Sequence, residues 1–276
     1  MSYDLRGNLT KHTDGESTMN KEYYWDSRDL LTKVVDQVAE KTIEYKYDAF
    51  GRRAAKRVDG GAWRWYFYDG LQVIAEGTSS SNKKYYTCNG APIGGIISYA
   101  NDHTGERMFY HYDRLGNVMA ITNNTGDCHT VYTMEAFGNV LEVGDAGYGY
   151  EHASDPQPYH LTTKEYDDDS RLYYFNARWY DNDYGRFLSR APMPREVEQP
   201  YTYCNNRPLV CTDPSGRMVV IPPMTDLFES ERQRTELAYE LAFSECARRA
   251  RREGRRIAHK NGQACYGRAL HYCNIM

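Results

Sequence analysis

One short motif returns along the first half of the chain at a spacing of 22 residues, and this spacing limits what the chain can fold into. The copies read YDLRGN from Tyr3, WDSRDL from Trp25, YDAFGR from Tyr47, YDG from Tyr68, YDRLGN from Tyr112 and MEAFGN from Met134. Tyr68 lies one residue short of its step, and the one skipped position falls at CNGAP, residues 88–92, which is itself a turn signal. Six positions on one register indicate a repeat architecture.

The chemistry of the unit predicts β-hairpins. In Tyr-Asp-x-x-Gly, aspartate favours the first position of a type I turn, and glycine favours the fourth, where a left-handed backbone leads into the next strand. Segments between the turns, such as RWYFYD and TVYTM, are β-rich, and 22 residues accommodate two short strands and two turns. The predicted repeat-turn residues are Asp4, Gly7, Asp48, Gly51, Asp113, Gly116 and Gly138.

The amino-acid composition favours the same class of fold. The chain has 26 Tyr against 8 Phe and 4 Trp, and tyrosine suits strands with one wet face. A length of 276 residues allows one large domain or two smaller ones. We predict a mainly β protein in which residues 1–216 form one continuous sheet and helix is confined mostly to residues 225–273.

Charge and cysteine usage exclude several function classes. The net charge of −4 divides into +4 over residues 217–276 and −8 over residues 1–216, which argues against nucleic acid as a partner of the whole chain. The mean hydropathy of −0.79 and the polar start MSYDLRGNLT predict no membrane span and no signal peptide. The seven cysteines contain no C-x-x-C pair, so no structural zinc site is expected in the first 216 residues. No cofactor or metal is expected.

Two longer stretches carry a specific signature. Residues 164–192 read KEYDDDSRLYYFNARWYDNDYGRFLSRAP, and residues 201–217 read YTYCNNRPLVCTDPSGR. With the Tyr-Asp-x-x-Gly units they resemble the YD repeats and the C-terminal repeat-associated core of the RHS (rearrangement hotspot) family, over roughly residues 3–216. The resemblance implies a β-sheet strip that spirals into a hollow shell, with the core as a plug at one end. We divide the chain into a YD-repeat strip (1–143), a repeat-associated core (144–216) and a tail (217–276).

The resemblance also implies a biological setting. RHS relatives enclose and deliver a C-terminal toxin or sit on bacterial surfaces, and the similar teneurin shells act in cell adhesion. The chain opens inside a repeat at Tyr3, so the first hairpin presents a bare edge strand. About six or seven hairpins give a strip that curves without closing into a chamber. We expect part of a larger shell that docks on an upstream shell protein, or on itself, through this edge.

The stretch CTDPSGR, residues 211–217, separates the aromatic-rich sequence from the tail. Pro214 fixes φ, Asp213 bonds forward to the backbone and Gly216 accepts a positive φ, so these three residues predict a boundary turn. In self-cleaving relatives the resemblance places the scissile bond just after this motif. Their chemistry is like that of an aspartic protease, in which two close carboxyls divide the roles of acid and base.

This chain departs from the self-cleaving pattern. Asp213 matches one of the two carboxyls, but Ala191 stands at the position of the other, in RFLSRAP. Arg190 matches a basic position of the active family, and Arg217 replaces the leucine that closes the motif. Neither Asp181 nor Asp183 lies in the motif's register. We predict that Asp213 and Arg190 are vestiges of an autoproteolytic site and that the chain does not cut itself.

The tail allows several interpretations. Residues 225–253 predict one helix that Thr225 caps, and residues 263–273 predict a second, shorter helix. The basic run at 248–256 suits nucleic acid or an anionic surface, although a solvated helix end is the simpler account. The thiols of Cys246, Cys265 and Cys273 suit a disulfide, a thiol cluster or zinc, without standard ligand spacing. The tail holds the place of the family's variable toxin but shows no nucleophile–base constellation.

Three functional hypotheses follow. The first is a non-enzymatic structural or encapsulating element of an RHS-type shell, related to secreted polymorphic toxins. The second is a self-cleaving core that releases a small C-terminal toxin. The third is an adhesin that binds glycans on its aromatic face. The acidic run at residues 167–169 suits a cation but fits a solvated turn better, because adjacent side chains on a strand point in opposite directions.

Overall fold

The computed structural model describes residues 1–14, 19–78, 83–91, 93–144, 157–192 and 199–220. Fourteen antiparallel strands form one sheet in strict chain order, so each strand pairs with the one before it and the one after it. They are β1 (Ser2–Tyr3), β2 (Leu9–Thr13), β3 (Asn20–Trp25), β4 (Leu31–Asp36), β5 (Lys41–Tyr47), β6 (Arg53–Val58), β7 (Arg64–Asp69), β8 (Gln72–Thr78), β9 (Lys84–Cys88), β10 (Ile96–Asn101), β11 (Arg107–Tyr112), β12 (Val118–Asn123), β13 (Cys128–Met134) and β14 (Val140–Gly144).

A second, smaller sheet follows the strip. It contains β15 (Glu165–Asp167), β16 (Leu172–Tyr174), β17 (Trp179–Asp181) and β18 (Arg186–Phe187), flanked by the short 3-10 turns η1 (Leu161–Thr163) and η2 (Cys204–Asn206). The prediction of one continuous sheet over residues 1–216 was therefore wrong. The core strands are only two or three residues long and pair with one another, because they pack face-on against the strip instead of extending its edge.

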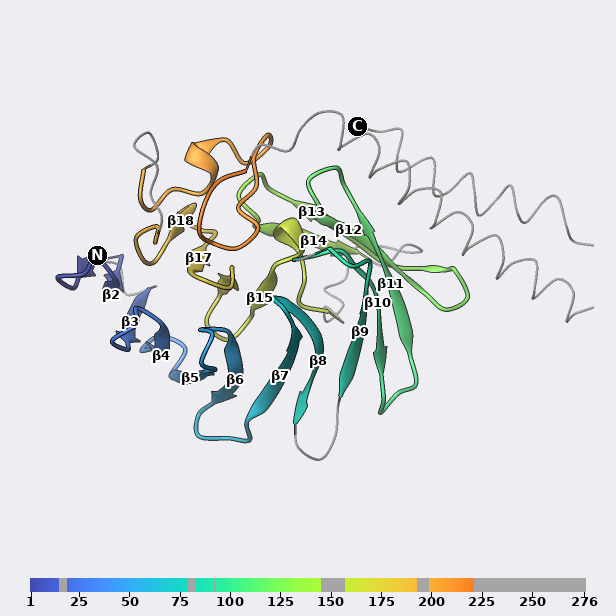
Figure 1. Cartoon of the computed structure of the whole chain (residues 1–276), viewed down its shortest axis with the longest axis horizontal. Coiled ribbons are helices and arrows are strands. Elements are labelled where there is room, and N and C mark those ends of the chain that lie inside the picture. Colours follow the sequence, from blue (N-terminus) through green and yellow to red (C-terminus); the bar gives the residue numbers. More distant parts are fainter. Residues whose placement is uncertain (15–18, 79–82, 92, 145–156, 193–198, 221–276) are drawn as a thin grey trace, which may run out of the picture.

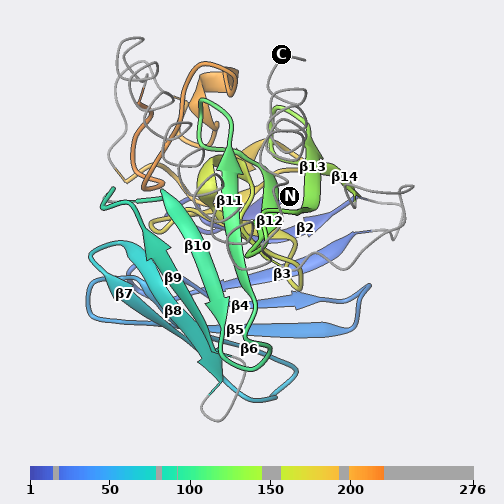
Figure 2. The ribbon, with the colours of Figure 1, turned by 90° about the vertical axis from the view of Figure 1, so that its right-hand side faces the viewer.

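The strip is strongly curved, and the core segment, residues 157–220, lies in its bend (Figure 1). Figure 2 shows the same arrangement from the side, with the yellow and orange core between the early and the later strands. Curvature has a local cause, because the first residue of each repeat unit sits at a break in strand register. These residues are Tyr3, Trp25, Tyr47, Tyr68, Tyr112 and Met134. A β-bulge bends its strand and increases the local twist.

The hydrophobic core forms where the inner face of the strip meets the core segment. Strands β2–β5 contribute residues such as Leu31 and Ile43 to one cluster, which also contains Leu172 and Trp179 of the small sheet. The later strands form a tyrosine-rich cluster around Tyr159. Since alternate strand residues point to the same face, each strand supplies one buried row and one exposed row.

The fold is mainly β, as predicted. Within the described residues, no helix has the length and apolar character needed to cross a membrane. The tail helices predicted for residues 225–253 and 263–273 lie outside the described residues. The division at residues 143 and 216 stays a prediction, although β14 ends at Gly144 and β15 begins at Glu165.

Candidate functional site

The repeat aromatics form a ladder of hydrogen bonds along one rim of the strip. In four units the ring donates to the backbone carbonyl of a residue 15 or 16 positions earlier, at the start of the preceding strand. The four bonds are Trp25 Nε1 to Leu9 (2.7 Å), Tyr47 Oη to Leu31 (2.7 Å), Tyr68 Oη to Arg53 (2.9 Å) and Tyr112 Oη to Ile96 (2.5 Å). The ladder ties each hairpin to the one before it.

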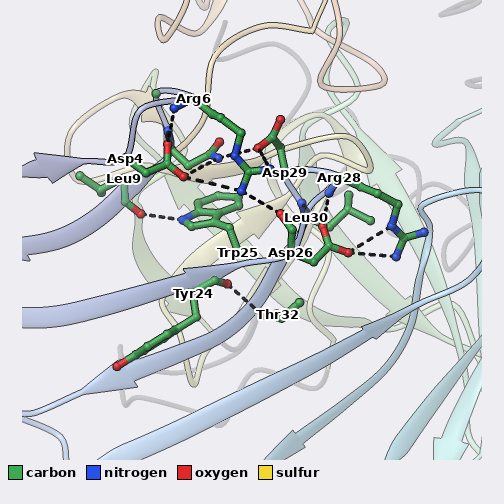
Figure 3. Close-up of polar contacts among 12 residues, drawn as sticks. Asp4, Arg6, Leu9, Tyr24, Trp25, Asp26, Arg28, Asp29, Leu30 and Thr32 are labelled. Carbon is green, nitrogen blue, oxygen red and sulfur yellow. Dashed lines mark hydrogen bonds and ion pairs between the residues drawn. The ribbon is translucent and has the colours of Figure 1, made fainter.

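In four units the turn after the aromatic is organised by its acidic residue, Asp4, Asp26, Asp48 or Asp113. Asp48 Oδ1 accepts the backbone N–H groups of Phe50 and Arg52, both at 2.9 Å, and Gly51 takes φ 79°. The turns of Asp4 and Asp26 repeat this pattern (Figure 3). Burial alone would raise the pKa of Asp48, but the bonds from Arg52 and Phe50 outweigh it and hold that pKa below its usual range.

Neighbouring turns are linked by arginine side chains. Arg6 donates to the carbonyl of Asp26 at 3.0 Å, and Arg28 donates to the carbonyl of Asp48 at 3.2 Å. Arg6 also forms an ion pair with Asp29 at 3.0 Å (Figure 3). The turns and arginines together make a continuous polar rim above the buried strands.

A buried ion pair joins the strip to the core. Arg53 on β6 is fully buried and pairs with Glu165 on β15. Its guanidinium lies 4.0 Å from the centre of the Tyr66 ring and 4.7 Å from that of Tyr174, so aromatic faces stand in for water. Burial raises the pKa of Glu165, and Arg53 opposes this rise.

A second charged group lies beside this pair. Lys56 pairs with both Asp167 and Asp169, and Tyr45 Oη donates to Asp167 at 2.8 Å. Lys41 also pairs with Asp169, at 2.9 Å. The prediction of a solvated turn at 167–169 was wrong for Asp167, which is buried because the strip supplies a lysine and a tyrosine for its carboxylate.

Asp213 lies in a buried turn of the core. Its Oδ2 accepts a hydrogen bond from Arg178 Nη2 at 2.9 Å, and its Oδ1 accepts the backbone N–H groups of Arg217 (3.0 Å) and Met218 (3.2 Å). Gly216 takes φ 72°, and an added Cβ there would lie 2.4 Å from the carbonyl oxygen of Phe175, so only glycine fits. Burial raises the pKa of Asp213, and Arg178 opposes the rise.

Lys164 is the other buried charge near Asp213. Desolvation lowers the pKa of Lys164 to about 8, and the Asp213 carboxylate only partly offsets this effect. The three groups Arg178, Asp213 and Lys164 therefore form a compact charged centre inside the core. Sequence reasoning missed both cationic members.

Ala191, Arg190 and Asp181 are not among the groups that bond Asp213. Ala191 donates its N–H to the carbonyl of Pro200 at 2.9 Å, and Arg178 Nη1 donates to the same carbonyl at 3.1 Å, so Ala191 lies beside the arginine that holds Asp213. Arg190 is exposed, and its aliphatic stem packs on the backbone of Gly7. Asp181 faces Asp183 and Lys21, and burial raises the pKa of Asp181 to about 6. Within the described residues, the groups that bond Asp213 or shift its pKa include no second carboxylate.

Cysteine and metal chemistry add little in the described part of the chain. Cys88, Cys128, Cys204 and Cys211 are not joined by disulfides. No group of three or more His, Cys, Asp or Glu in the described ranges is placed to hold a metal ion. The predicted cluster of Cys246, Cys265 and Cys273 lies outside the described residues.

Comparison with known proteins identifies the architecture. The model of the Teneurin YD-shell family matches residues 1–208. The chain belongs to this family. The similar proteins include the tRNA3(Ser)-specific nuclease WapA of Bacillus spizizenii, 36% identical over 230 residues, and Teneurin-3 of Danio rerio, 25% identical over 240 residues. These alignments cover 79% and 76% of this chain but only 9% and 8% of the relatives, so the YD-shell chain spans about a tenth of their length.

Solved structures show the same fold. The crystal structure of the TcdB2–TccC3 complex matches 78% of this chain and 11% of the other chain, with a TM-score of 0.60 and 17% identity. The sequence-based assignment to the RHS/YD-repeat proteins is therefore confirmed. The chain is a segment of YD shell related to shells found in toxin proteins.

Proposed function

We propose that this chain is a non-enzymatic, encapsulating segment of a YD shell. The observation that carries the proposal is the buried Arg53–Glu165 pair, which fixes the core segment against the inner face of the strip. A charge is buried at this seam only where a partner and ring faces replace water. This matching of inner face to core favours a shell wall with a fixed internal plug, as the YD-shell family implies.

The centre around Asp213 supports a structural role over self-cleavage. Both oxygens of Asp213 are engaged, by Arg178 and by two backbone N–H groups. Aspartic-protease chemistry needs a second carboxyl that carries a proton, and Ala191 supplies none. Asp213 and Arg190 are therefore proposed to be vestigial, and the boundary turn of Asp213, Pro214 and Gly216 is proposed to hold the end of the core in place.

The first strand indicates where the shell continues. In the ladder described above, each aromatic hydroxyl or indole bonds a carbonyl on the preceding strand, whereas within the described residues the hydroxyl of Tyr3 bonds only Met1 Sδ, at 3.7 Å. The Tyr3 ring packs against the Tyr201 ring at a centroid distance of 5.5 Å and a tilt of 58°, which leaves the hydroxyl available for one further rung. We propose that another YD hairpin, from an upstream shell segment or a second copy, adds at the edge of β1.

The names of the relatives are the reason to propose a toxin-related function. Three WapA proteins that match at 36% identity are named as tRNA nucleases, which favours a shell that surrounds a toxic cargo. We propose that residues 217–276 take the place of such a cargo in this chain. Nuclease activity is a property of those relatives. We do not propose it for the described residues of this chain, which form the shell segment.

A chimera tests the encapsulating role. The matched 230 residues of the Bacillus spizizenii relative are replaced by this chain, and the purified chimera is digested with a non-specific protease. A shell segment should leave the chimera as resistant as the parent. The same chimera with Glu165→Gln should lose resistance, while one with Glu44→Gln, which breaks an exposed pair on the outer face, should keep it. A chimera that is digested like an unfolded chain would contradict the proposal.

A second candidate, glycan binding, rests on one surface. Trp65 and Phe67 on β7, Ile74 on β8 and Tyr85 on β9 are exposed on the outer face, with Phe67 at 59% and Tyr85 at 48%. Register pairs Phe67 with Ala75 and Ala75 with Tyr85, so the two rings flank one strand. Such rings can stack on sugars. Oligosaccharide binding that survives Phe67→Ser with Tyr85→Ser, or that falls equally with the control Phe50→Ser, would reject this role.

A further inference from the structure

A cavity of about 290 Å³ opens where the polar rim of the strip meets the core segment. Its walls come from the turns at residues 6–8, 28–30 and 50–52 and from core residues 176–178, 189–192 and 215–217. Among the residues that the structure describes, the lining contains six arginines and one acidic residue, Asp29, and no lysine, histidine or glutamate. The arginines are Arg6, Arg28, Arg52, Arg178, Arg190 and Arg217.

Four of these arginines are held in place by the fold. Arg6 is held by Asp29 at 3.0 Å and Arg28 by Asp26 at 3.1 Å. Arg52 is held by Asp48 at 2.7 Å and Arg178 by Asp213 at 2.9 Å. A guanidinium carries five N–H donors, and Arg52 uses two of them on Asp48 and Gly70, whereas Arg178 is committed to Asp213, Gly216 and Pro200. The cavity therefore presents rigid cationic groups with spare donors, which costs a ligand little ordering entropy.

The remaining two arginines give the cavity its excess charge. Arg190 and Arg217 are exposed, and neither forms an ion pair within the described residues. The aliphatic stem of Arg190 packs against Gly7, and a Cβ added to Gly7 would lie 2.5 Å from Arg190 Cδ. This contact fixes the position from which the guanidinium extends. The six arginines exceed their carboxylate partners Asp4, Asp26, Asp29, Asp48 and Asp213 by one charge.

The ligand is identified by geometry and charge. The arginines come from several walls of the cavity, from both the strip and the core. A planar carboxylate offers two oxygens in one plane, whereas a tetrahedral oxyanion offers acceptors in several directions at once. Arginine is also the side chain that best matches phosphate oxygens. We propose that this cavity is a phosphate-binding site, filled by inorganic phosphate or by the phosphate group of a small ester.

The experiment is isothermal titration calorimetry on the full chain at neutral pH, with chloride held constant. Inorganic phosphate and glycerol 3-phosphate are titrated in parallel, with acetate as a planar anion. Phosphate should bind saturably and acetate should not. Tighter binding of the ester than of inorganic phosphate assigns the site to esters, and the reverse assigns it to the free ion.

Variants decide whether the cavity is responsible. Arg190→Gln with Arg217→Gln should weaken phosphate binding at least about tenfold, since charge-assisted hydrogen bonds are lost. Both residues are exposed, so the unfolding curve should stay unchanged. The control Arg107→Gln with Arg207→Gln removes the same charge from exposed positions outside the cavity and should leave binding intact. No saturable phosphate binding, equal acetate binding or equal loss in the control would overturn the proposal.

Discussion

Replacing Glu165 with glutamine is expected to destabilise the protein strongly. Arg53 is fully buried, and its Nε and Nη1 atoms have no hydrogen-bond partner, so Glu165 is its neutralising group. Glutamine fits the same space but carries no charge, and the Arg53 guanidinium cannot lose its proton. An unpaired buried charge costs about 3–5 kcal/mol, a large share of the stability of a domain.

The reverse substitution should cost less. In Arg53→Met the carboxyl of Glu165 loses its cation, but it can take up a proton, because burial already raises its pKa. Because the pKa of Glu165 is higher in the folded state than in the unfolded state, the folded state takes up this proton first as pH falls. The destabilisation caused by Arg53→Met is therefore present above the folded pKa of Glu165 and is lost as pH falls through that pKa. The double variant Arg53→Met with Glu165→Leu should lie near the wild type.

Urea unfolding followed by tryptophan fluorescence measures these differences, because Trp179 lies 5.5 Å from the Arg53 guanidinium. The matched control is the ion pair of Arg57 and Glu44, on the outer face of the neighbouring strands β6 and β5 and about one-third exposed (31% each). Breaking it should cost much less than Glu165→Gln, because solvent screens an exposed ion pair. A loss of unfolding free energy for Glu165→Gln that is no larger than that for Arg53→Met at neutral pH would contradict this role of Glu165. A double variant that shows the sum of both losses would contradict it as well.

Three further outcomes are expected. Lys164→Met should stabilise the protein at neutral pH by up to about 3 kcal/mol, since folding lowers the pKa of that lysine from 10.5 to about 8, and it should remove the gain in stability that the wild type shows as pH rises through that interval. Denaturation curves across this pH range check both effects, and parallel curves for variant and wild type would contradict them. Ala191→Asp with Arg217→Leu should produce a break after residue 217 in mass spectrometry while the wild type stays intact; cleavage of the wild type would show that Asp213 needs no partner. Tyr68→Phe should cost about 1 kcal/mol in thermal unfolding, since the carbonyl of Arg53 loses its donor, and an unchanged curve would show that the ladder does not stabilise the strip.

The repeat made much of the fold predictable. The Tyr-Asp-x-x-Gly spacing identified consecutive hairpins, and the structure contains fourteen strands in chain order. The sequence could not show that the small sheet packs face-on against the strip. Its strands, such as β15 and β18, are two or three residues long, too short for a periodic pattern to separate them from turns. Their place depends on long-range partners such as Tyr45 and Lys56.

The candidate site was predictable only in part. Asp213 was singled out from its motif, but Arg178, its ion-pair partner, lies 35 residues earlier and carries no local signal. Lys164 was also missed, because a lysine in sequence is expected at the surface. Arg190 was named for its position in the motif, yet the structure places it on the wall of the arginine-lined cavity and not among the groups that bond Asp213.

Departures from the repeat mark where the core docks. The residue five positions after the acidic residue is apolar and buried in three units, as Leu9, Leu31 and Val118. In the third unit this position is Arg53, and it meets Glu165. A charge in an apolar register is stable only if a partner covers it, so the exception itself predicts a buried counter-charge elsewhere in the chain.

The last unit departs in the same way. Met134 and Glu135 replace the usual tyrosine and aspartate, and Met134 packs against the cluster that contains Leu161. An added Cβ on Gly138 would lie 2.9 Å from Leu161 Cδ2, and the Tyr173 hydroxyl donates to the Gly138 carbonyl at 2.7 Å. A tyrosine hydroxyl at position 134 would need a partner inside this apolar contact, whereas methionine needs none. In a YD strip, the units that break the pattern are therefore the ones to examine first for contacts with the core.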